Sequence, residues 1–187
     1  MAKLIVFNNI SLDGYFTDAD GEMRWAYSSV QDSEWDIFVA SNASGGGTLV
    51  FGRVTYEMMQ SFWPTPQAMQ AYPALAERMN KYSKIVFSRT LTEATWNNTR
   101  LINDDLIEEV RELKKSPDNH MAILGSGSIV SQLAEARLID EFQFVMTPVV
   151  LGAGRTLFEG IKGHLPLKLK STRVFKNGNA VLFYAPG

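Results

Sequence analysis

The sequence contains no cysteine and only two histidines, His120 and His164. The absence of cysteine excludes disulfides, thiolate metal sites, iron–sulfur clusters and a cysteine nucleophile. Two histidines without cysteine leave too few ligands for most zinc sites. We therefore expect no bound metal.

Neither sign of charge predominates, because 18 Lys and Arg residues stand against 20 Asp and Glu residues. This balance provides no broad cationic field for nucleic acid or anionic lipid. No apolar run approaches the roughly 18 residues that span a bilayer, and the start MAKLIVFNNISLDG lacks the features of a signal peptide. We expect a cytoplasmic protein that binds neither nucleic acid nor membranes.

The chain has 187 residues, of which 45% are hydrophobic and 20% are charged. That length and composition are typical of one large globular domain. The sequence contains no repeat, low-complexity tract or linker. A single domain covering residues 1–187 is predicted.

Short apolar runs alternate with helical patterns along most of the chain. The runs that predict strands cover residues 3–10, 48–51, 84–87, 101–102, 121–124 and 142–147. The periodic stretches that predict helices cover residues 32–43, 53–62, 74–81 and 104–115, and a further helix follows GSGS at 125–128. Such alternation favours an α/β fold with helices against a mostly parallel sheet.

The remaining segments contain turn and loop signals. Residues 16–25 are predicted to form a mobile loop, Gly45-Gly46-Gly47 ends the first helix, and the prolines at 64, 66 and 73 mark a connection. On the helix at 53–62, apolar Val54, Met58 and Phe62 share one face. Asn177-Gly178, between β-rich runs at 167–175 and 180–184, predicts a terminal antiparallel hairpin.

The stretch HMAILGSGSIVSQL is an apolar strand, a turn at Gly125-Ser126-Gly127-Ser128 and a helix. Small residues allow close approach of a diphosphate, and a helix N-terminus favours an anion. A tight turn capped by serines would have the same sequence. The motif is no Rossmann fingerprint, since Val130 stands where the third glycine belongs, and no Walker lysine is present.

Two other predicted strands end in residues that could hold an anion. Gly52-Arg53 with Thr55 follows one strand, and Ser88-Arg89-Thr90 follows another. Each could equally be a polar turn with a solvated arginine. Because strand ends of an open α/β sheet meet at one edge, we expect these groups to converge there.

Residues for hydrolysis are not arranged in a recognised pattern. Leu124 stands where the G-x-S-x-G motif around Ser126 needs its first glycine. Among the carboxylates, Asp13 in SLDG and the group Asp32, Glu34 and Asp36 could lie near a pocket or be solvated charges. We predict Asp13 as the catalytic carboxylate, because SLDG leads from the first strand into the pocket.

The ordered set LIVFNNISLDGYF, FGRVTYE, IVFSRT, ILGSGSIVSQL and TPVVLGAGRTLFEG resembles the dihydrofolate-reductase-like superfamily. Within it, nearly the whole chain is similar to the reductase domain of the bifunctional riboflavin-biosynthesis deaminase-reductase. The resemblance implies a three-layer αβα fold with a mixed, mostly parallel sheet of about eight strands that ends in an antiparallel hairpin. It also implies an NADPH-dependent reductase that acts on a small-molecule substrate.

The resemblance implies a role for each matching residue. Gly52, Arg53, Val54 and Thr55 match the first phosphate-contacting helix start, and Ser88, Arg89 and Thr90 match the loop that receives the adenosine 2′-phosphate. Gly125, Ser126, Gly127, Ser128 and Ile129 match the loop over the diphosphate and nicotinamide ribose. Asn8, Asn9, Ile10 and Phe16 match neighbours of the nicotinamide.

The expected reaction is hydride transfer to a small heterocyclic or sugar-linked imine or carbonyl, like that of 5-amino-6-(5-phosphoribosylamino)uracil reductase. A dihydrofolate reductase proper and a non-catalytic nucleotide-binding sensor are the alternatives. Against the former, Met23-Arg24-Trp25 lacks the family's proline, and Val30 stands near the place of the pterin-binding carboxylate, with Asp32 two positions on. A homodimer is expected, with TPVVLGAGRTLF and the terminal hairpin on the edge opposite the cofactor.

Overall fold

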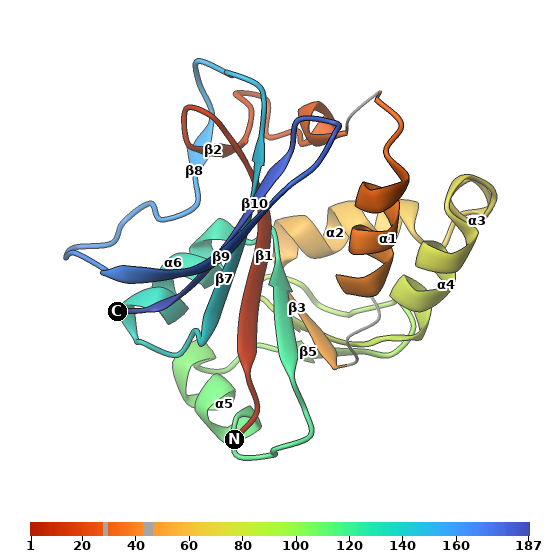
Figure 1. The fold of residues 1–187 in the computed structure, drawn as a ribbon. Helices are drawn as coiled ribbons and strands as arrows, with labels where there is room; N and C mark the ends of the chain where they lie inside the picture. The colour runs from red at the N-terminus through yellow and green to blue at the C-terminus, as the bar shows by residue number, and fades with distance from the viewer. Residues whose placement is uncertain (28–29, 43–46) are drawn as a thin grey trace.

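The computed structural model describes residues 1–27, 30–42 and 47–187. A large eight-stranded sheet, with strand order β5-β4-β3-β6-β1-β7-β10-β9, runs through the protein (Figure 1). Its strands are β1 (Leu4–Ser11), β3 (Thr48–Gly52), β4 (Ser83–Phe87), β5 (Thr99–Ile102), β6 (Met121–Leu124), β7 (Glu141–Thr147), β9 (Leu167–Val174) and β10 (Ala180–Pro186). A separate two-stranded sheet pairs β2 (Tyr15–Thr17) with β8 (Arg155–Thr156).

In the large sheet, the six strands from β5 to β7 are parallel to one another. Only β10 runs antiparallel, to β7 on one side and to β9 on the other. The predicted mixed sheet that ends in an antiparallel hairpin is therefore confirmed.

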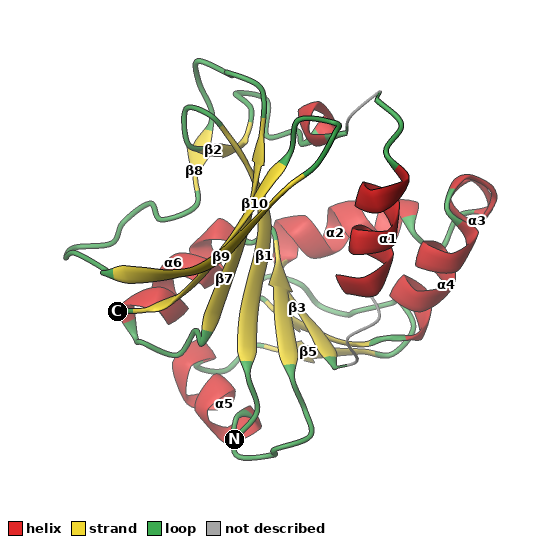
Figure 2. Cartoon of the chain, viewed as in Figure 1, coloured by secondary structure: helices red, strands yellow, loops and turns green. Residues whose placement is uncertain are grey.

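Helices cover both faces of the sheet, as Figure 2 shows by colour. They are η1 (Arg24–Ala26), α1 (Ser33–Asn42), α2 (Arg53–Phe62), α3 (Pro66–Ala71), α4 (Pro73–Lys81), α5 (Leu106–Leu113) and α6 (Gly127–Glu135). Helices α5 and α6 share one hydrophobic cluster with the sheet, and α1, α2 and α4 contribute to two clusters on the other face. This arrangement is the three-layer αβα fold expected from the sequence.

Alternation along β3 shows how one strand serves both helical layers. Val50 packs in the cluster of α5 and α6, whereas Phe51 packs with Tyr56 of α2 in the opposite layer. Successive side chains of a strand point to opposite faces, so an uninterrupted apolar run fits a strand covered on both sides. Each fully buried side chain of this kind stabilises the fold by about 1.5–3 kcal/mol.

The apolar face predicted for the helix at 53–62 does not point into the core. Val54 is 62% exposed and Met58 is 37% exposed, whereas Thr55 and Tyr56 are buried. The core-packed Tyr56 and Met59 also have helical spacing, so periodicity alone could not choose between the two faces of α2. The contact of Thr55 with the turn after β6, described below, fixes the rotation of α2.

Two predicted connections contain regular structure. The loop predicted at 16–25 includes the end of β2 and the first two residues of η1. Strand β2 forms because it pairs with β8 from a distant part of the chain. The proline-marked connection includes α3, with Pro66 at the first helical position and Thr65 accepting a hydrogen bond from Ala68 N. Of the glycines predicted to end the first helix, Gly45 and Gly46 lie outside the described residues.

The parallel strands β1, β3, β4 and β6 end at one edge of the sheet, which positions their following turns close together. In the described ranges, no helix is long and apolar enough to cross a membrane.

Candidate functional site

The turn from β6 into α6 has an unusual backbone. Gly125 and Ser126 are both left-handed, with φ of 58° and 59°. For a residue with a side chain this conformation costs about 1–2 kcal/mol. Ser126 N donates to Thr55 Oγ1 at 3.0 Å, and Ser126 Oγ accepts from Gly52 N at 2.9 Å. The same hydroxyl donates to Leu124 O at 3.0 Å, so Ser126 joins the ends of β3 and β6.

Close packing at this junction requires glycine at Gly125 and leaves little room for a side chain at Gly52. A Cβ atom added at Gly125 would lie 2.8 Å from Thr55 Oγ1, and one added at Gly52 would lie 3.3 Å from Ile129 Cγ1. The structure therefore brings together Gly52, Thr55, Gly125, Ser126 and Ile129, which the sequence analysis had placed in two separate motifs.

The first turn of α6 offers two backbone donors. Ser126 O accepts from the N–H groups of Ile129 and Val130, which begins the helical pattern. The N–H groups of Gly127 and Ser128 have no acceptor within the described parts of the chain. A left-handed residue followed by helical ones directs successive N–H groups at one point, and the helix dipole adds positive potential there. This arrangement suits an anion.

Asn8 has a buried acceptor near the same turn. Its side chain is 2% exposed, and Nδ2 donates to Gly125 O at 3.1 Å. Its Oδ1 atom has no donor among the described residues. Burying an unpaired acceptor costs about 1–3 kcal/mol, and this atom is closed to solvent in the structure. Asn9 and Ile10 follow on the same strand and are half-buried.

Phe16 changes the expected role of Gly127. A Cβ atom added at Gly127 would lie 2.9 Å from both Cε1 and Cζ of Phe16, whose side chain is buried. The absence of a side chain at Gly127 thus admits the Phe16 ring.

The two predicted arginines differ in their partners. Arg53 pairs with Glu57 on the next turn of α2, with its NH1 atom 3.0 Å from Oε2. Exposed pairs of this kind contribute only about 0–1 kcal/mol, so an anion can compete for Arg53. Arg89 is exposed and has no ion-pair partner in the described structure, which leaves its guanidinium available.

The hydroxyl of Ser88 is engaged in the turn after β4. It accepts from Thr90 N at 3.2 Å and from Leu91 N at 2.9 Å. The turn is anchored by Ser88 N, which donates to Ile102 O at 3.0 Å. Ser88 therefore shapes this turn, while the exposed Thr90 and Arg89 side chains face solvent.

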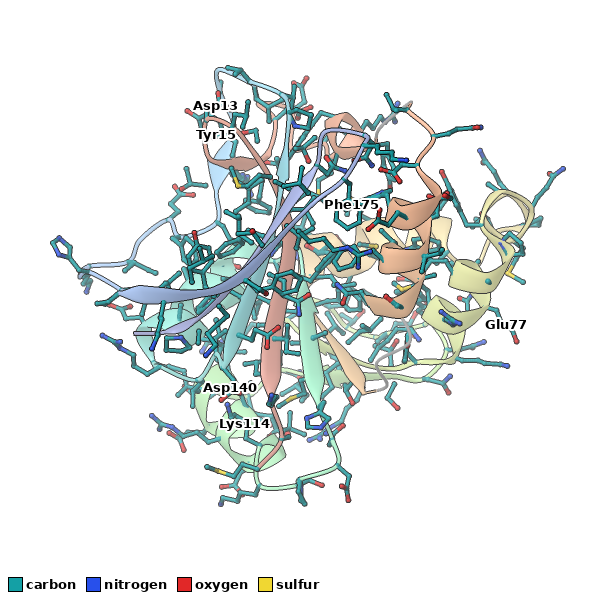
Figure 3. All side chains as sticks on the ribbon, viewed as in Figure 1. Asp13, Tyr15, Glu77, Lys114, Asp140 and Phe175 are labelled. Atoms are coloured by element: carbon teal, nitrogen blue, oxygen red, sulfur yellow. The ribbon has the colours of Figure 1, made fainter. Side chains whose placement is uncertain are left out.

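Asp13 lies with Tyr15 at the top of the molecule in Figure 3. Ser11 Oγ donates to Asp13 Oδ1 at 2.6 Å, and Gly152 N donates to Oδ2 at 2.7 Å. The Ser11 hydroxyl, against the opposing effect of desolvation, and the N–H groups of Gly152 and Leu151 lower the pKa of Asp13 to about 2. A carboxyl group with that pKa carries no proton near neutrality; the predicted catalytic role itself remains a prediction.

Sequence reasoning did not identify the role of Asp32. This buried residue caps α1, because Oδ1 accepts from Glu34 N and Trp35 N, and Oδ2 accepts from Asn177 N at 3.1 Å. Burial opposes ionisation, but the backbone N–H groups outweigh it and lower the pKa of Asp32. An aspartate immediately before a helical pattern is the usual signal for such a cap.

Residues 147–158 are not on the edge opposite the predicted cofactor site. Leu151 and Gly152 bind Asp13, and Leu157 O lies 3.7 Å from the position of a Cβ atom on Gly127. The segment therefore lies beside the first turn of α6. The terminal hairpin does lie at an edge of the large sheet, because β9 is its last strand.

The fold places the protein in the dihydrofolate-reductase-like class. The dihydrofolate reductase of Enterococcus faecalis, solved in complex with NADP(H), superimposes with a TM-score of 0.63 over 99% of this chain and 96% of that one, at 16% sequence identity. More specifically, the chain belongs to the RibD C-terminal domain family, whose model matches residues 2–181.

Two similar proteins match nearly the whole chain. The uncharacterized protein YyaP of Bacillus subtilis (strain 168) is 30% identical over 182 residues, which cover 97% of this chain and 94% of that protein. A putative riboflavin biosynthesis protein from Shewanella sp. PV-4 has a TM-score of 0.80 and 25% identity, covering 100% of this chain and 99% of that one. The resemblance inferred from sequence motifs is confirmed.

Proposed function

We propose that the protein is an NADPH-dependent reductase that transfers a hydride to an imine or carbonyl group of a small heterocyclic or sugar-linked substrate. Membership of the RibD C-terminal family supports a reductase. The observation that carries the proposal is the Gly125-Ser126 turn, which presents the unpaired N–H groups of Gly127 and Ser128 at the first turn of α6.

Each part of the dinucleotide has a chemical counterpart in these residues. The N–H groups of Gly127 and Ser128 would bind the diphosphate, because a helix N-terminus stabilises an anion. Asn8, Asn9, Ile10 and Phe16 would lie around the nicotinamide, as the family resemblance implies, with the buried Asn8 holding Gly125 O through its Nδ2 atom. The free guanidinium of Arg89 would bind the 2′-phosphate, and Arg53 could join it on leaving Glu57.

The chain's own contribution to the reaction would be binding and orientation. Bound NADPH supplies the hydride, and the protein holds the nicotinamide against the substrate and excludes water. Reduction of an imine or carbonyl also requires one proton on the nitrogen or oxygen. We assign that proton to a single ordered water molecule, because the low pKa of Asp13 leaves its carboxylate without a proton to donate near neutral pH.

Within this class we propose a substrate like that of 5-amino-6-(5-phosphoribosylamino)uracil reductase. The family supports it, and so does the similar Shewanella protein, which is described as a putative riboflavin biosynthesis protein. Dihydrofolate is less suitable, because Asp32, the nearest carboxylate to the pterin-binding place, is engaged in capping α1 and binding Asn177 N.

The test is a titration of the purified protein with NADPH and with NADH, followed by a scan of candidate substrates for loss of reduced-nicotinamide absorbance. We expect saturable NADPH binding and turnover with a pyrimidine that carries a sugar phosphate. Turnover of dihydrofolate would identify a dihydrofolate reductase, whereas NADPH binding without turnover of any candidate would indicate a sensor. A failure to bind NADPH would overturn the proposal.

A further inference from the structure

We propose that Asp13 is a positioning residue that holds a two-segment cap, made of residues 11–17 and 149–157, against the first turn of α6. The inference rests on the proposed function, because that turn is the proposed NADPH site. It also assigns Asp13 a role other than proton donation.

Asp13 connects the two segments of the cap directly. Its carboxylate accepts from Leu151 N at 3.1 Å and 3.2 Å and from Gly152 N at 2.7 Å. On its own segment it accepts from the Ser11 hydroxyl, whose oxygen in turn accepts from Tyr15 N at 2.9 Å. Hydrogen bonds to a charged acceptor are roughly twice as strong as neutral ones. Asp13 thus fixes both segments at once.

Backbone contacts continue the connection from Asp13 toward α6. Leu12 N donates to Val149 O at 2.8 Å, and β2 pairs with β8. At Gly154 the segments are so close that an added Cβ atom would lie 2.0 Å from Thr17 O. Only glycine, here with φ of 153°, permits this approach. The two segments are therefore joined at several points along their length.

The cap contacts the proposed cofactor site through Phe16 and Leu157. Both side chains are buried in the cluster that contains α6. The Phe16 ring occupies the space beside the Cα atom of Gly127, and Leu157 O is the next nearest atom to that space. Gly127 N–H is one of the two free donors, so the cap contacts the residue that would bind the diphosphate.

These contacts form a physical chain from Asp13 through β2 and Phe16 to Gly127. Asp13 is charged at neutral pH, so its hydrogen bonds persist under working conditions. Without the carboxylate, the N–H groups of Leu151 and Gly152 lose their acceptor, and the cap can separate into two loops. Phe16 would then pack less firmly beside Gly127, and the first turn of α6 would be less well ordered for its ligand.

The proposal is tested with Asp13→Ala and the isosteric Asp13→Asn. The matched control is Asp20→Ala, which removes an exposed carboxylate that has no hydrogen-bond partner among the described residues of the same loop. The readouts are the amide NMR resonances of Gly127 and Ser128 and the dissociation constant of NADPH. We expect Asp13→Ala to shift both resonances and to weaken NADPH binding about tenfold. Asp13→Asn keeps one acceptor oxygen and should cause a smaller change in the same direction.

A double-mutant cycle tests whether Phe16 carries the effect. Phe16→Leu should weaken NADPH binding by itself, and adding Asp13→Ala should then cost less than it does in the wild-type protein. Full additivity would show that Asp13 does not act through Phe16 and would overturn the proposal. If Asp13→Ala does not fold, the same cycle is made with Asp13→Asn.

The outcomes separate this inference from the proposed function. If the wild-type protein does not bind NADPH, the proposed function fails, while the Gly127 and Ser128 resonances still test the role of Asp13. If the wild-type protein binds NADPH and both Asp13 variants behave as Asp20→Ala does, the proposed function stands and the positioning role is overturned.

Discussion

Ser126 Oγ accepts a hydrogen bond from Gly52 N across 2.9 Å, and this contact joins residues that are 74 positions apart in the chain. It connects the end of β3 to the end of β6, where the sequence shows two unrelated anion motifs. Ser126 is left-handed in this position, so the hydrogen bonds offset the cost of its backbone conformation. The hydroxyl of Ser126 therefore joins the two motifs into one site.

Two substitutions at Ser126 separate the stabilisation from its hydrogen bonds from the destabilisation caused by its left-handed backbone. Ser126→Ala leaves Gly52 N without its acceptor and retains the strained φ, so we expect a loss of about 1–3 kcal/mol in the free energy of unfolding. Ser126→Gly loses the same bonds but relieves the strain, and should be less destabilising. Urea denaturation measures both. A glycine variant less stable than the alanine variant would contradict this account.

Gly127→Val should disturb Phe16 before it obstructs a ligand. The added side chain overlaps the ring, and overpacking of this kind costs about 1–3 kcal/mol of stability. We expect a lower unfolding midpoint together with NADPH binding weakened by about 2 kcal/mol or more. The control is Gly163→Ala, because a Cβ atom added at Gly163 meets no atom within 4 Å. Unchanged stability in Gly127→Val would show that Phe16 does not occupy that space.

Arg89 should determine the preference for NADPH over NADH. A guanidinium and a 2′-phosphate form charge-assisted hydrogen bonds worth roughly 1.5–3 kcal/mol, so NADPH should bind ~10 to 150-fold more tightly. Arg89→Ala should remove most of this preference and spare NADH binding, whereas Arg111→Ala on α5 should have no effect. Calorimetric titrations at low salt provide the comparison. Equal affinities in the wild-type protein would place the adenosine end elsewhere.

Asp32 should make stability depend on acidity. Its pKa is lowered in the folded protein, so the carboxylate stabilises the fold above the ordinary Asp range and loses that contribution as pH falls through the folded-state value. Asp32→Asn should therefore be destabilised at pH 7, with a difference from the wild-type protein that shrinks on acidification below about pH 4. Thermal melts across this range measure it. A difference independent of pH would assign the effect to packing alone.

The association state is a separate prediction. β9 has no neighbouring strand on its outer side in the described structure, and an unpaired edge is a template for association. We expect a homodimer, seen by light scattering as a mass near twice 20.9 kDa at tens of micromolar protein. Lys168 and Lys170 on β9 should make direct pairing of two such edges sensitive to salt. A monomeric mass at that concentration would contradict the expectation.

Local patterns in the sequence determined most of the fold. The apolar runs and helical spacings predicted the strands of the large sheet and its long helices, with most ends within about two residues of those observed. Asn177-Gly178 predicted the hairpin, although only Gly178 has a positive φ and the turn is also held by Asp32, which accepts from Asn177 N. Strand β2 and helix α3 were not predicted, because β2 depends on pairing with the remote Arg155–Thr156 and α3 lies among prolines.

The sequence by itself also determined which residues could bind an anion, because glycine, serine and arginine after strands have that chemistry wherever they lie. Only the tertiary structure decided how each is used. In the folded protein α2 is oriented so that Thr55 accepts a hydrogen bond from Ser126 N, and the Phe16 ring packs against Gly127. Arg53 pairs with Glu57, whereas Arg89 has no ion-pair partner among the described residues. The fold also engages Asp13 with Leu151 and Gly152. These roles depend on contacts between residues far apart in the chain, and no local pattern encodes them.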